Sequence, residues 1–376
     1  MPRQELEIET AVIIGGGIFG VSTAAQLVRM GVRVTVINDG PLGTGASGRS
    51  LAWLNSARRR SLPYHRIRQA GMERYRSFAS QKTGVDWIKF DGGLTWDAAD
   101  ETNEIEQIFR YERDLGYEAE LLSAKEVSAR IEGVAGEAVT AQGAIFNPSE
   151  GWVDLPTLIQ RLAKDITAAG GTIITDQGQA DLILQNGRTA GASTANGKSY
   201  KADAVLVAAG ASGPAILASH GVHIGDDTPI GLLVETKPVD HPLRVVLNTP
   251  RVAIRPTLNG AFFMDSAWSE EEVIIHEDGN FEAMSETIRG LLDEARKVLD
   301  PEPELEVAAV HIGPKPIPEG GDPVFGEVHA LPGCFIAFSH SGATQGLIAG
   351  ELLGEEIAYG MRHPMLECFR PERFNR

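Results

Sequence analysis

The sequence has few cysteines and no long uninterrupted apolar run. Cys334 and Cys368 are the only cysteines in 376 residues, and they do not form a CxxC pattern. This excludes a disulfide framework and a cysteine-rich zinc site. The first ten residues, MPRQELEIET, lack the apolar core of a signal peptide, and the more apolar residues 11–30 carry glycines and polar side chains. We therefore expect a cytoplasmic protein without a strong membrane signal.

Positive charge is also scarce. The chain has 34 Lys and Arg against 51 Asp and Glu, which gives a formal net charge of -17. Such an acidic protein is a poor partner for nucleic acid or for an anionic membrane surface. The one basic cluster comprises Arg58, Arg59 and Arg60. These arginines could attract an anionic substrate, although three adjacent arginines more often form a solvated surface.

A glycine-rich turn follows the first apolar run, AVII at residues 11–14. The pattern GGGIFG, residues 15–20, lies between this predicted strand and a helical pattern. Gly15 allows the tight turn, Gly17 lets the backbone approach a pyrophosphate, and Gly20 permits close packing of helix and strand. Because a second strand follows the helix, the pattern predicts a dinucleotide site. The same segment contributes two further predicted cofactor contacts, Ile18 and Phe19.

The second strand ends without the acidic residue that usually closes such a unit. Residues 32–37 alternate as a strand does, and Asn38 and Asp39 follow. The amide oxygen of Asn38 can accept a ribose hydroxyl, and the carboxylate of Asp39 can supply the missing acid. An NADP phosphate would favour an arginine here, and the strand end has none. The pattern disfavours NADP and leaves FAD and NAD open.

Small and hydroxyl-bearing residues dominate the next segment, residues 40–55. Such a loop can surround a second phosphate with backbone amides and short hydroxyls, which an ordinary NAD domain does not need. A plain flexible loop is the alternative interpretation. The residues predicted to contact the cofactor here are Thr44, Ser47, Gly48, Arg49 and Ser50.

A strand, a glycine turn and a helix are predicted near the end of the chain. Residues 334–338 form an apolar run, the turn SHSG follows, and a helical pattern extends from Thr344 to Tyr359 before Gly360. The start of such a helix carries about half a positive charge, which would stabilise a reduced, anionic flavin. The cofactor contacts predicted from this segment are Ser341, Gly342, Ala343, Thr344 and Gln345.

In this order and spacing, the segments resemble the D-amino-acid oxidase superfamily of FAD-dependent oxidoreductases, which includes glycine oxidase and sarcosine oxidase. The motifs GGGIFG, GTGASGRS, ADAVLVAAGASG, IGPKPIPEGGDP and SHSGATQG carry the resemblance, which covers nearly the whole chain. It implies FAD as the cofactor, with further contacts from Ala180, Ala209 and Gly210. Sarcosine-oxidase-like relatives attach flavin to a cysteine beside the segment that residues 311–315 match. These residues contain no cysteine, so we expect non-covalent FAD.

The resemblance implies an α/β fold in which a Rossmann-like FAD-binding domain is interleaved with an antiparallel-sheet substrate domain. The sequence agrees, because residues 228–275 read as successive strands and a helix is predicted over residues 285–299. Further helices are predicted from Pro63 to Gln81 and from Leu155 to Ala168. The expected FAD-binding domain comprises residues 1–85, 145–222 and 312–376, and the substrate-binding domain comprises residues 86–144 and 223–311.

Five side chains are candidates for the substrate site. Lys315 matches a position where amino-acid-oxidising relatives carry an arginine that binds the substrate carboxylate, but lysine lacks the arginine fork. A flavin contact and a surface position are the alternatives for Lys315. His340 matches a residue near the flavin ring, with a catalytic proton role and a packed, hydrogen-bonded role both open. Trp53 and Asn55 could line the flavin face, and Arg255 could point into the site or away from it.

The resemblance implies an FAD-dependent oxidoreductase that oxidises a C–N bond of a small amine or amino acid. Hydride would pass to flavin, the resulting imine would hydrolyse, and O2 or another electron acceptor would complete turnover. Three alternatives stay open: oxidation of a C–OH bond of a hydroxy acid, a non-catalytic FAD-binding subunit of a larger complex, and an NAD(P) dehydrogenase. The last would not need the SHSGATQG segment.

Overall fold

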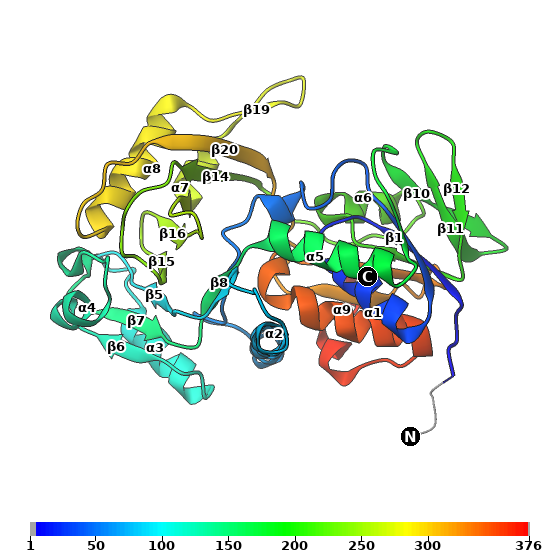
Figure 1. Cartoon of the computed structure of the whole chain (residues 1–376), viewed down its shortest axis with the longest axis horizontal. Helices are drawn as coiled ribbons and strands as arrows, with labels where there is room; N and C mark the ends of the chain where they lie inside the picture. The colour runs from blue at the N-terminus through cyan, green and yellow to red at the C-terminus, as the bar shows by residue number, and fades with distance from the viewer. Residues whose placement is uncertain (1–4, 375–376) are drawn as a thin grey trace.

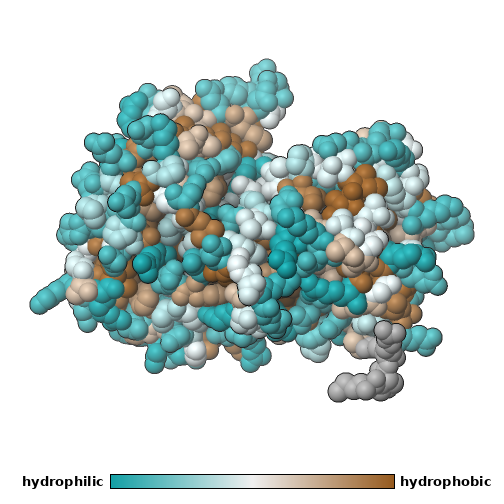
Figure 2. Space-filling model, in the orientation of Figure 1, coloured by the Kyte–Doolittle hydropathy of each residue, from teal (hydrophilic) through white to brown (hydrophobic). Residues whose placement is uncertain are grey.

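A computed structural model of the chain describes residues 5–374 and shows mixed α/β architecture. Figure 1 shows two lobes, with α2 (Leu62–Ser80) and β8 (Gly151–Val153) between them. One lobe contains a six-stranded sheet and the other an eight-stranded sheet. Figure 2 shows a largely hydrophilic surface with a notch between the lobes at the upper edge. Within residues 5–374, no helix is long and apolar enough to cross a membrane.

The six-stranded sheet is parallel except at the β21 edge, and helices and strands cover its two faces. Ile13 packs on one face with α1, α5 and α9, while Val12 and Ile14 pack on the other with β10, β11 and α6. In order, its strands are β21 (Val324–Glu327), β22 (Cys334–Phe338), β13 (Ala204–Val207), β1 (Thr10–Ile14), β2 (Arg33–Ile37) and β9 (Thr172–Ile174). The covering elements are α1 (Ile18–Met30), α5 (Leu155–Ala168), α9 (Gly342–Tyr359), α6 (Gly213–Ala218), β10 (Ala180–Gln185), β11 (Arg188–Thr194) and β12 (Ser199–Lys201).

The eight-stranded sheet is antiparallel except where β15 pairs with β5. Its inner face contributes Leu232, Ile254 and Met264 to a second core, which α8 covers. In order, its strands are β20 (Val307–Pro314), β14 (Ile230–Thr236), β17 (Phe262–Asp265), β16 (Ala253–Pro256), β15 (Val246–Asn248), β5 (Gly93–Thr95), β7 (Ala144–Asn147) and β6 (Glu120–Leu122). The helices beside it are α3 (Ile105–Asp114), α4 (Ala124–Arg130), α7 (Ala267–Glu271) and α8 (Ser285–Val298).

Three small sheets complete the described part of the chain, and the first consists of the covering strands β10, β11 and β12. Two others lie elsewhere. One joins the lobes, and the other is a hairpin outside the main sheets. The joining sheet has β3 (Trp53–Leu54), β8 and β4 (Ile88–Lys89), and the hairpin has β18 (Ile274–Ile275) and β19 (Phe281–Glu282).

The predicted fold class and most predicted elements are confirmed. The helix α5 has the predicted bounds, and α9 begins two residues earlier than predicted, at Gly342. Gly31 and Gly360 end α1 and α9 in the left-handed conformation that glycine adopts freely. Two strands, β7 and β20, span the expected domain boundaries at 144/145 and 311/312. The division into domain segments stays a prediction.

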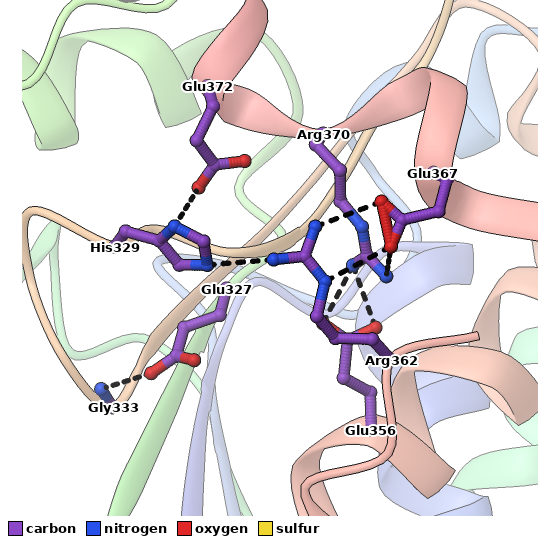
Figure 3. Close-up of polar contacts among 8 residues, drawn as sticks. All are labelled: Glu327, His329, Gly333, Glu356, Arg362, Glu367, Arg370 and Glu372. Carbon is purple, nitrogen blue, oxygen red and sulfur yellow. Dashed lines mark hydrogen bonds and ion pairs between the residues drawn. The ribbon is translucent and has the colours of Figure 1, made fainter. Parts of the chain in front are cut away.

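Paired charges hold the C-terminal segment against the six-stranded sheet (Figure 3). The Nη1 atom of Arg370 donates to both carboxylate oxygens of Glu356, at 2.7 and 2.8 Å, and both side chains are buried. Arg362 binds Glu367 with two hydrogen bonds of 3.1 and 3.0 Å. The ring of His329 lies between Arg362 and the carboxylate of Glu372, which belongs to a 3-10 helix (Pro371–Phe374). This network ties residues 362–374 to α9 and to the loop after β21.

Candidate active site

The glycine-rich turn between β1 and α1 has the geometry that the sequence predicts. Gly15 adopts a φ of 114°, and a Cβ atom there would lie 2.3 Å from the carbonyl oxygen of Ala208. A Cβ atom on Gly20 would lie 1.9 Å from the carbonyl oxygen of Gly15. Side chains at these positions would therefore prevent α1 from starting directly above β1. The close approach brings the N-terminus of α1 to the edge of a large cavity.

Asn38 and Asp39 differ in how their polar atoms are used. Asn38 Oδ1 accepts the Gly16 backbone N–H at 2.8 Å, and Asn38 Nδ2 donates to the carbonyl oxygens of Gly40 at 2.7 Å and Pro41 at 3.1 Å. The amide of Asn38 thus braces the loop that follows β2. Asp39 is exposed, lines the cavity and has no hydrogen-bond or ion-pair partner among the described residues. The ribose contact that we predicted for both residues stays a prediction, and the free carboxylate is the better placed acceptor.

Residues 40–50 form an ordered loop around the start of α1. Ser47 Oγ accepts the Ile18 backbone N–H at 3.1 Å, within a single turn of 3-10 helix (Ala46–Gly48). Arg49 Nη1 donates to the carbonyl oxygen of Thr44 at 2.8 Å, while the buried Nε atom of Arg49 has no partner in residues 5–374. Burial lowers the pKa of the Arg49 guanidinium. These hydrogen bonds join the loop to itself and to the start of α1.

A cavity of about 750 Å³ extends from this turn to the eight-stranded sheet. Most of the predicted site residues line it, and they come from segments far apart in the sequence. These residues are Gly15, Gly17, Ile18, Phe19, Asn38, Asp39, Thr44, Ser47, Arg49, Ser50, Trp53, Asn55, Ala180, Ala209, Gly210, Lys315, His340, Ser341, Gly342, Ala343 and Thr344.

Four predicted site residues do not line the cavity. Gly20 and Gly48 instead permit close backbone approaches, since a Cβ atom on Gly48 would lie 2.4 Å from the carbonyl oxygen of Gly43. Gln345 is fully buried, and its Oε1 accepts the Ser339 hydroxyl at 3.0 Å. Arg255 is 2% exposed, and its guanidinium lies 5.1 Å and 4.7 Å from the ring centroids of Trp152 and Phe263. The sequence leaves open whether Arg255 points into the site or away from it, and the structure places its guanidinium against these two rings and not on the cavity wall.

The start of α9 is held by side chains of α2 that sequence reasoning missed. Tyr64 hydroxyl and Ser341 Oγ lie 2.7 Å apart, and Arg68 Nη1 donates to Ser341 Oγ. Arg68 also donates to the carbonyl oxygen and the Oδ1 atom of Asn55, at 2.8 and 2.7 Å. Asn55 is therefore occupied by protein contacts. The i, i+4 spacing of Tyr64 and Arg68 could have placed them on one helix face, but not against α9.

His340 lies between groups of positive charge. Its ring is exposed to the cavity and surrounded by protein on its other sides. Burial, together with the charges of Lys315, Arg68 and Arg60, lowers the pKa of the His340 imidazole well below its usual range. The ring is thus neutral near pH 7 and can donate or accept one hydrogen bond at each nitrogen, according to its tautomer.

Lys315 forms an ion pair that the sequence did not predict. Its ammonium contacts the Glu270 carboxylate of α7, and Asp265 at the end of β17 acts on the same charge. Burial alone would lower the pKa of Lys315, but the two carboxylates raise it above its ordinary value. Burial raises the pKa values of Asp265 and Glu270, and Lys315 opposes that rise. The predicted contact of Lys315 with substrate stays a prediction. The ion pair with Glu270 already compensates the charge of Lys315.

Of the three adjacent arginines, one faces the cavity. Arg58 pairs with Asp97 at 2.8 Å, and Arg59 pairs with Glu104 at 3.2 Å near the surface. Arg60 lines the cavity, and its guanidinium lies 5.8 Å from the centroid of the Tyr64 ring. Burial, with a smaller contribution from Arg68, lowers the pKa of Arg60 to about 10, so the group remains charged.

The cavity fits a flavin dinucleotide. Both α1 and α9 begin at its wall, and neither N-cap residue, Gly17 or Ser341, caps its helix with a side chain. At α1 the Ile18 N–H is donated to Ser47 Oγ. The other N–H groups at these helix starts are suited to bind the phosphates at α1 and an anionic ring at α9. Gly17 leaves open space beside the α1 start, where only Ser47 Oγ lies near the position of a Cβ atom, at 3.3 Å. These features accommodate an elongated anionic cofactor between the two helix starts.

Comparisons with known proteins agree with this geometry. Residues 10–356 match the family model described as FAD dependent oxidoreductase. The chain is 27% identical over 367 residues to the uncharacterized oxidoreductase YurR of Bacillus subtilis, covering 93% of this chain and 94% of that protein. It is 23% identical over 359 residues to glycine oxidase of Geobacillus kaustophilus, covering 92% and 91%. The crystal structure of that glycine oxidase superimposes with a TM-score of 0.80 at 20% identity, covering 97% of this chain and 98% of the other.

Proposed function

This chain belongs to the FAD dependent oxidoreductase family, and we propose that it oxidises a C–N bond of a small amine or amino acid. FAD, when bound, supplies the two-electron oxidant that accepts hydride from the carbon beside nitrogen, which leaves an imine for hydrolysis. Turnover then requires O2 or another electron acceptor. The similarity to glycine oxidase supports the choice of an amine nitrogen over a hydroxyl.

The single observation that carries this proposal is the charge distribution at the substrate end of the cavity. Arg60, Asp265 and Glu270 line the cavity, and we call this part of it the substrate end. Charges of both signs are therefore available there to a small dipolar ligand. His340 is neutral beside them, and its pKa is too low for it to act as an acid near pH 7. Once the bound amine has lost its proton, C–N oxidation by hydride transfer needs a positioned nitrogen and a dry site more than it needs a strong acid.

Residues around the cofactor end would hold FAD without a covalent bond. Cys334 is buried in β22, and burial raises the pKa of its thiol to about 12. Cys368 lies on the C-terminal segment, and its side chain is exposed. Neither cysteine lines the cavity in the described part of the chain. Phosphate binding is assigned to Gly17 and Ser47, and ribose binding to Asp39.

The proposal is tested with FAD-loaded protein under anaerobic conditions. Amines, D-amino acids and N-methyl amino acids are mixed with the protein, and the loss of flavin absorbance is followed. Each amino acid is paired with the hydroxy acid of the same carbon skeleton. We expect at least one nitrogen compound to bleach the flavin while its hydroxy analogue does not. Bleaching by the hydroxy acids alone would favour C–OH oxidation, and no bleaching by any compound would contradict the proposal.

A further inference from the structure

We propose that Arg60 binds an anionic group of the substrate, and that Asp265, beside the ion pair of Glu270 and Lys315, binds its ammonium group. This inference rests on the proposed function and names the ligand that its site accepts. It assigns the anion to the loop before α2, and not to the segment after β20 that carries Lys315. The substrate would then be a small amine with an acidic group, held between two walls of opposite charge.

Arg60 is a cation without a counter-ion. No carboxylate oxygen lies within 4.0 Å of its guanidinium among residues 5–374, and its buried Nε atom has no hydrogen-bond partner there. The neighbouring arginines, Arg58 and Arg59, each have a carboxylate partner. A partly buried guanidinium that lines a cavity is costly to leave unpaired. A carboxylate ligand could bind it with two parallel hydrogen bonds.

Lys315 is a poor anchor for an anion. Its ammonium already contacts Glu270, and both side chains pack along β14 near Gly231. A second carboxylate, Asp265, lies close enough to raise the pKa of Lys315. An incoming anion would meet two carboxylates around one ammonium. The cluster of Asp265, Glu270 and Lys315 therefore repels anions and attracts a cation.

Asp265 provides the complementary binding group. It ends β17, lines the cavity and has no hydrogen-bond partner in the part of the chain that the structure describes. Burial raises the pKa of Asp265, because the ionised carboxylate loses hydration there, and the charge of Lys315 opposes that rise. A substrate ammonium would compensate the charge of the carboxylate and provide hydrogen-bond donors. His340 lines the same cavity as Lys315 and Arg60. Burial lowers the pKa of its imidazole, and the charges of Lys315, Arg68 and Arg60 lower it further.

Arg49 is a competing anion site, whereas the guanidinium of Arg68 already donates to Asn55 and Ser341. Arg49 also lines the cavity and lacks a carboxylate partner among residues 5–374. However, Arg49 donates to Thr44 within the dinucleotide loop, and its guanidinium packs against Gly313, with Cζ 2.7 Å from the position of a Cβ atom there. The Arg60 guanidinium instead lies 5.8 Å from the ring centroid of Tyr64, whose hydroxyl contacts Ser341 at the start of α9. The proposal places Arg49 with the cofactor and Arg60 with the substrate.

The test uses three ligands that cannot be oxidised, because the carbon beside nitrogen or carboxylate carries no hydrogen. Pivalate presents only an anion, tert-butylamine only a cation, and α-aminoisobutyrate presents both. Each is titrated into FAD-loaded protein, and the change in the visible flavin spectrum gives the Kd. Since no oxidation is involved, the result does not depend on whether the protein oxidises C–N bonds.

We expect two separate losses of affinity. Arg60→Gln should raise the Kd of pivalate and α-aminoisobutyrate by about tenfold to a hundredfold, and Arg60→Lys should restore part of it. Asp265→Asn should weaken tert-butylamine and α-aminoisobutyrate by about tenfold and leave pivalate unchanged. Arg59→Gln is the matched control and should alter none of the three. Flavin content and melting temperature verify that each variant is folded and loaded.

Several outcomes would overturn the assignment. Pivalate affinity could fall in Arg49→Gln or Lys315→Met and persist in Arg60→Gln, which would move the anion site. If the parent protein binds neither pivalate nor tert-butylamine, both binding assignments are refuted. If the three ligands behave as expected but no amine bleaches the flavin, the binding assignment stands and the proposed reaction fails.

Discussion

The C-terminal segment and the cavity wall both carry charged side chains within the protein, but these charges are compensated in different ways. Arg370 and Glu356 are 6% and 3% exposed and bind each other directly (Figure 3). In the cavity, Arg60 has no carboxylate partner among residues 5–374, and Lys315 pairs with Glu270 while Asp265 also raises its pKa. Charges that are paired within the protein stabilise the fold, whereas unpaired charges on a cavity wall are free to bind a ligand. The contrast makes predictions for stability and for binding.

The largest expected effect is at Arg370. Arg370→Met leaves the buried Glu356 carboxylate uncompensated, which should lower the free energy of unfolding by about 3–5 kcal/mol. Arg60→Met removes a cation that has no partner, so stability should change little. Chemical denaturation of both variants measures the difference. Arg362→Met is the control, because its ion pair with Glu367 is 44% and 49% exposed and should contribute less than about 1 kcal/mol.

The contrast between Arg60 and Arg370 fails if replacing either arginine lowers the free energy of unfolding by the same amount. Equal destabilisation by Arg60→Met and Arg370→Met would mean that Arg60 is a structural residue. The double variant Arg370→Met with Glu356→Leu refines the test, since replacing both partners removes the unpaired charge. It should recover part of the stability lost in Arg370→Met alone.

Glu150 gives an intermediate case, because it has hydrogen bonds but no cation. It is fully buried, accepts the Tyr117 hydroxyl at 2.5 Å and the Ser56 backbone N–H at 3.1 Å, and has no ion-pair partner in the described part of the chain. Burial raises the pKa of Glu150 from 4.5 to about 8. The folded state therefore binds the proton more tightly than the unfolded state. Stability should be highest below the unfolded pKa and should fall as pH rises through about 8.

Glu150→Gln tests this dependence. Glutamine keeps the shape and the acceptor oxygen but cannot ionise, so the loss of stability between about pH 5 and about pH 9 should shrink by a few kcal/mol. Melting temperatures of parent and variant at both pH values measure the effect. The same pH slope in parent and variant would assign the proton uptake to another group.

The sequence predicts elements whose signals are local. The bounds of α5 follow from Asp154, whose side chain accepts the Thr157 N–H at 2.9 Å, and from a proline in the first turn. The turn at Gly15 and the end of α9 at Gly360 depend on backbone conformations that favour glycine. These features need no knowledge of distant residues.

The substrate end could not be predicted, because its contacts join distant segments. Lys315 contacts Glu270, which no local pattern connects with it. Alternation along β16 places Ile254 and Arg255 on opposite faces but does not say which face meets the cavity, and Arg255 proved to be enclosed by Trp152 and Phe263. Among three adjacent arginines, only the path of the chain before α2 selects Arg60. Physical principles constrain these positions only once the packing is known.

The smallest expected effect applies the same distinction to the cofactor end. Asp39 has a free carboxylate on the cavity wall, and Asn38 is satisfied by Gly16, Gly40 and Pro41. Asp39→Ala should therefore weaken FAD binding by about a few-fold to tenfold through a lost ribose hydrogen bond, while the apoprotein keeps its melting temperature. Asn38→Ala should lower the melting temperature of the apoprotein as well, because it removes the brace of the loop.

Flavin fluorescence on titration of apoprotein with FAD gives the two affinities, and calorimetry gives the apoprotein melting temperatures. Asp39→Asn is the matched control, since it keeps the size of the side chain and removes the charge. If the carboxylate binds ribose hydroxyls, Asp39→Asn should fall between the parent and Asp39→Ala, because the amide retains one acceptor oxygen. Unchanged FAD affinity in all three variants would refute the ribose assignment. A loss confined to Asn38→Ala would show instead that the loop is positioned by the amide and that the cavity-facing carboxylate has no part in cofactor binding.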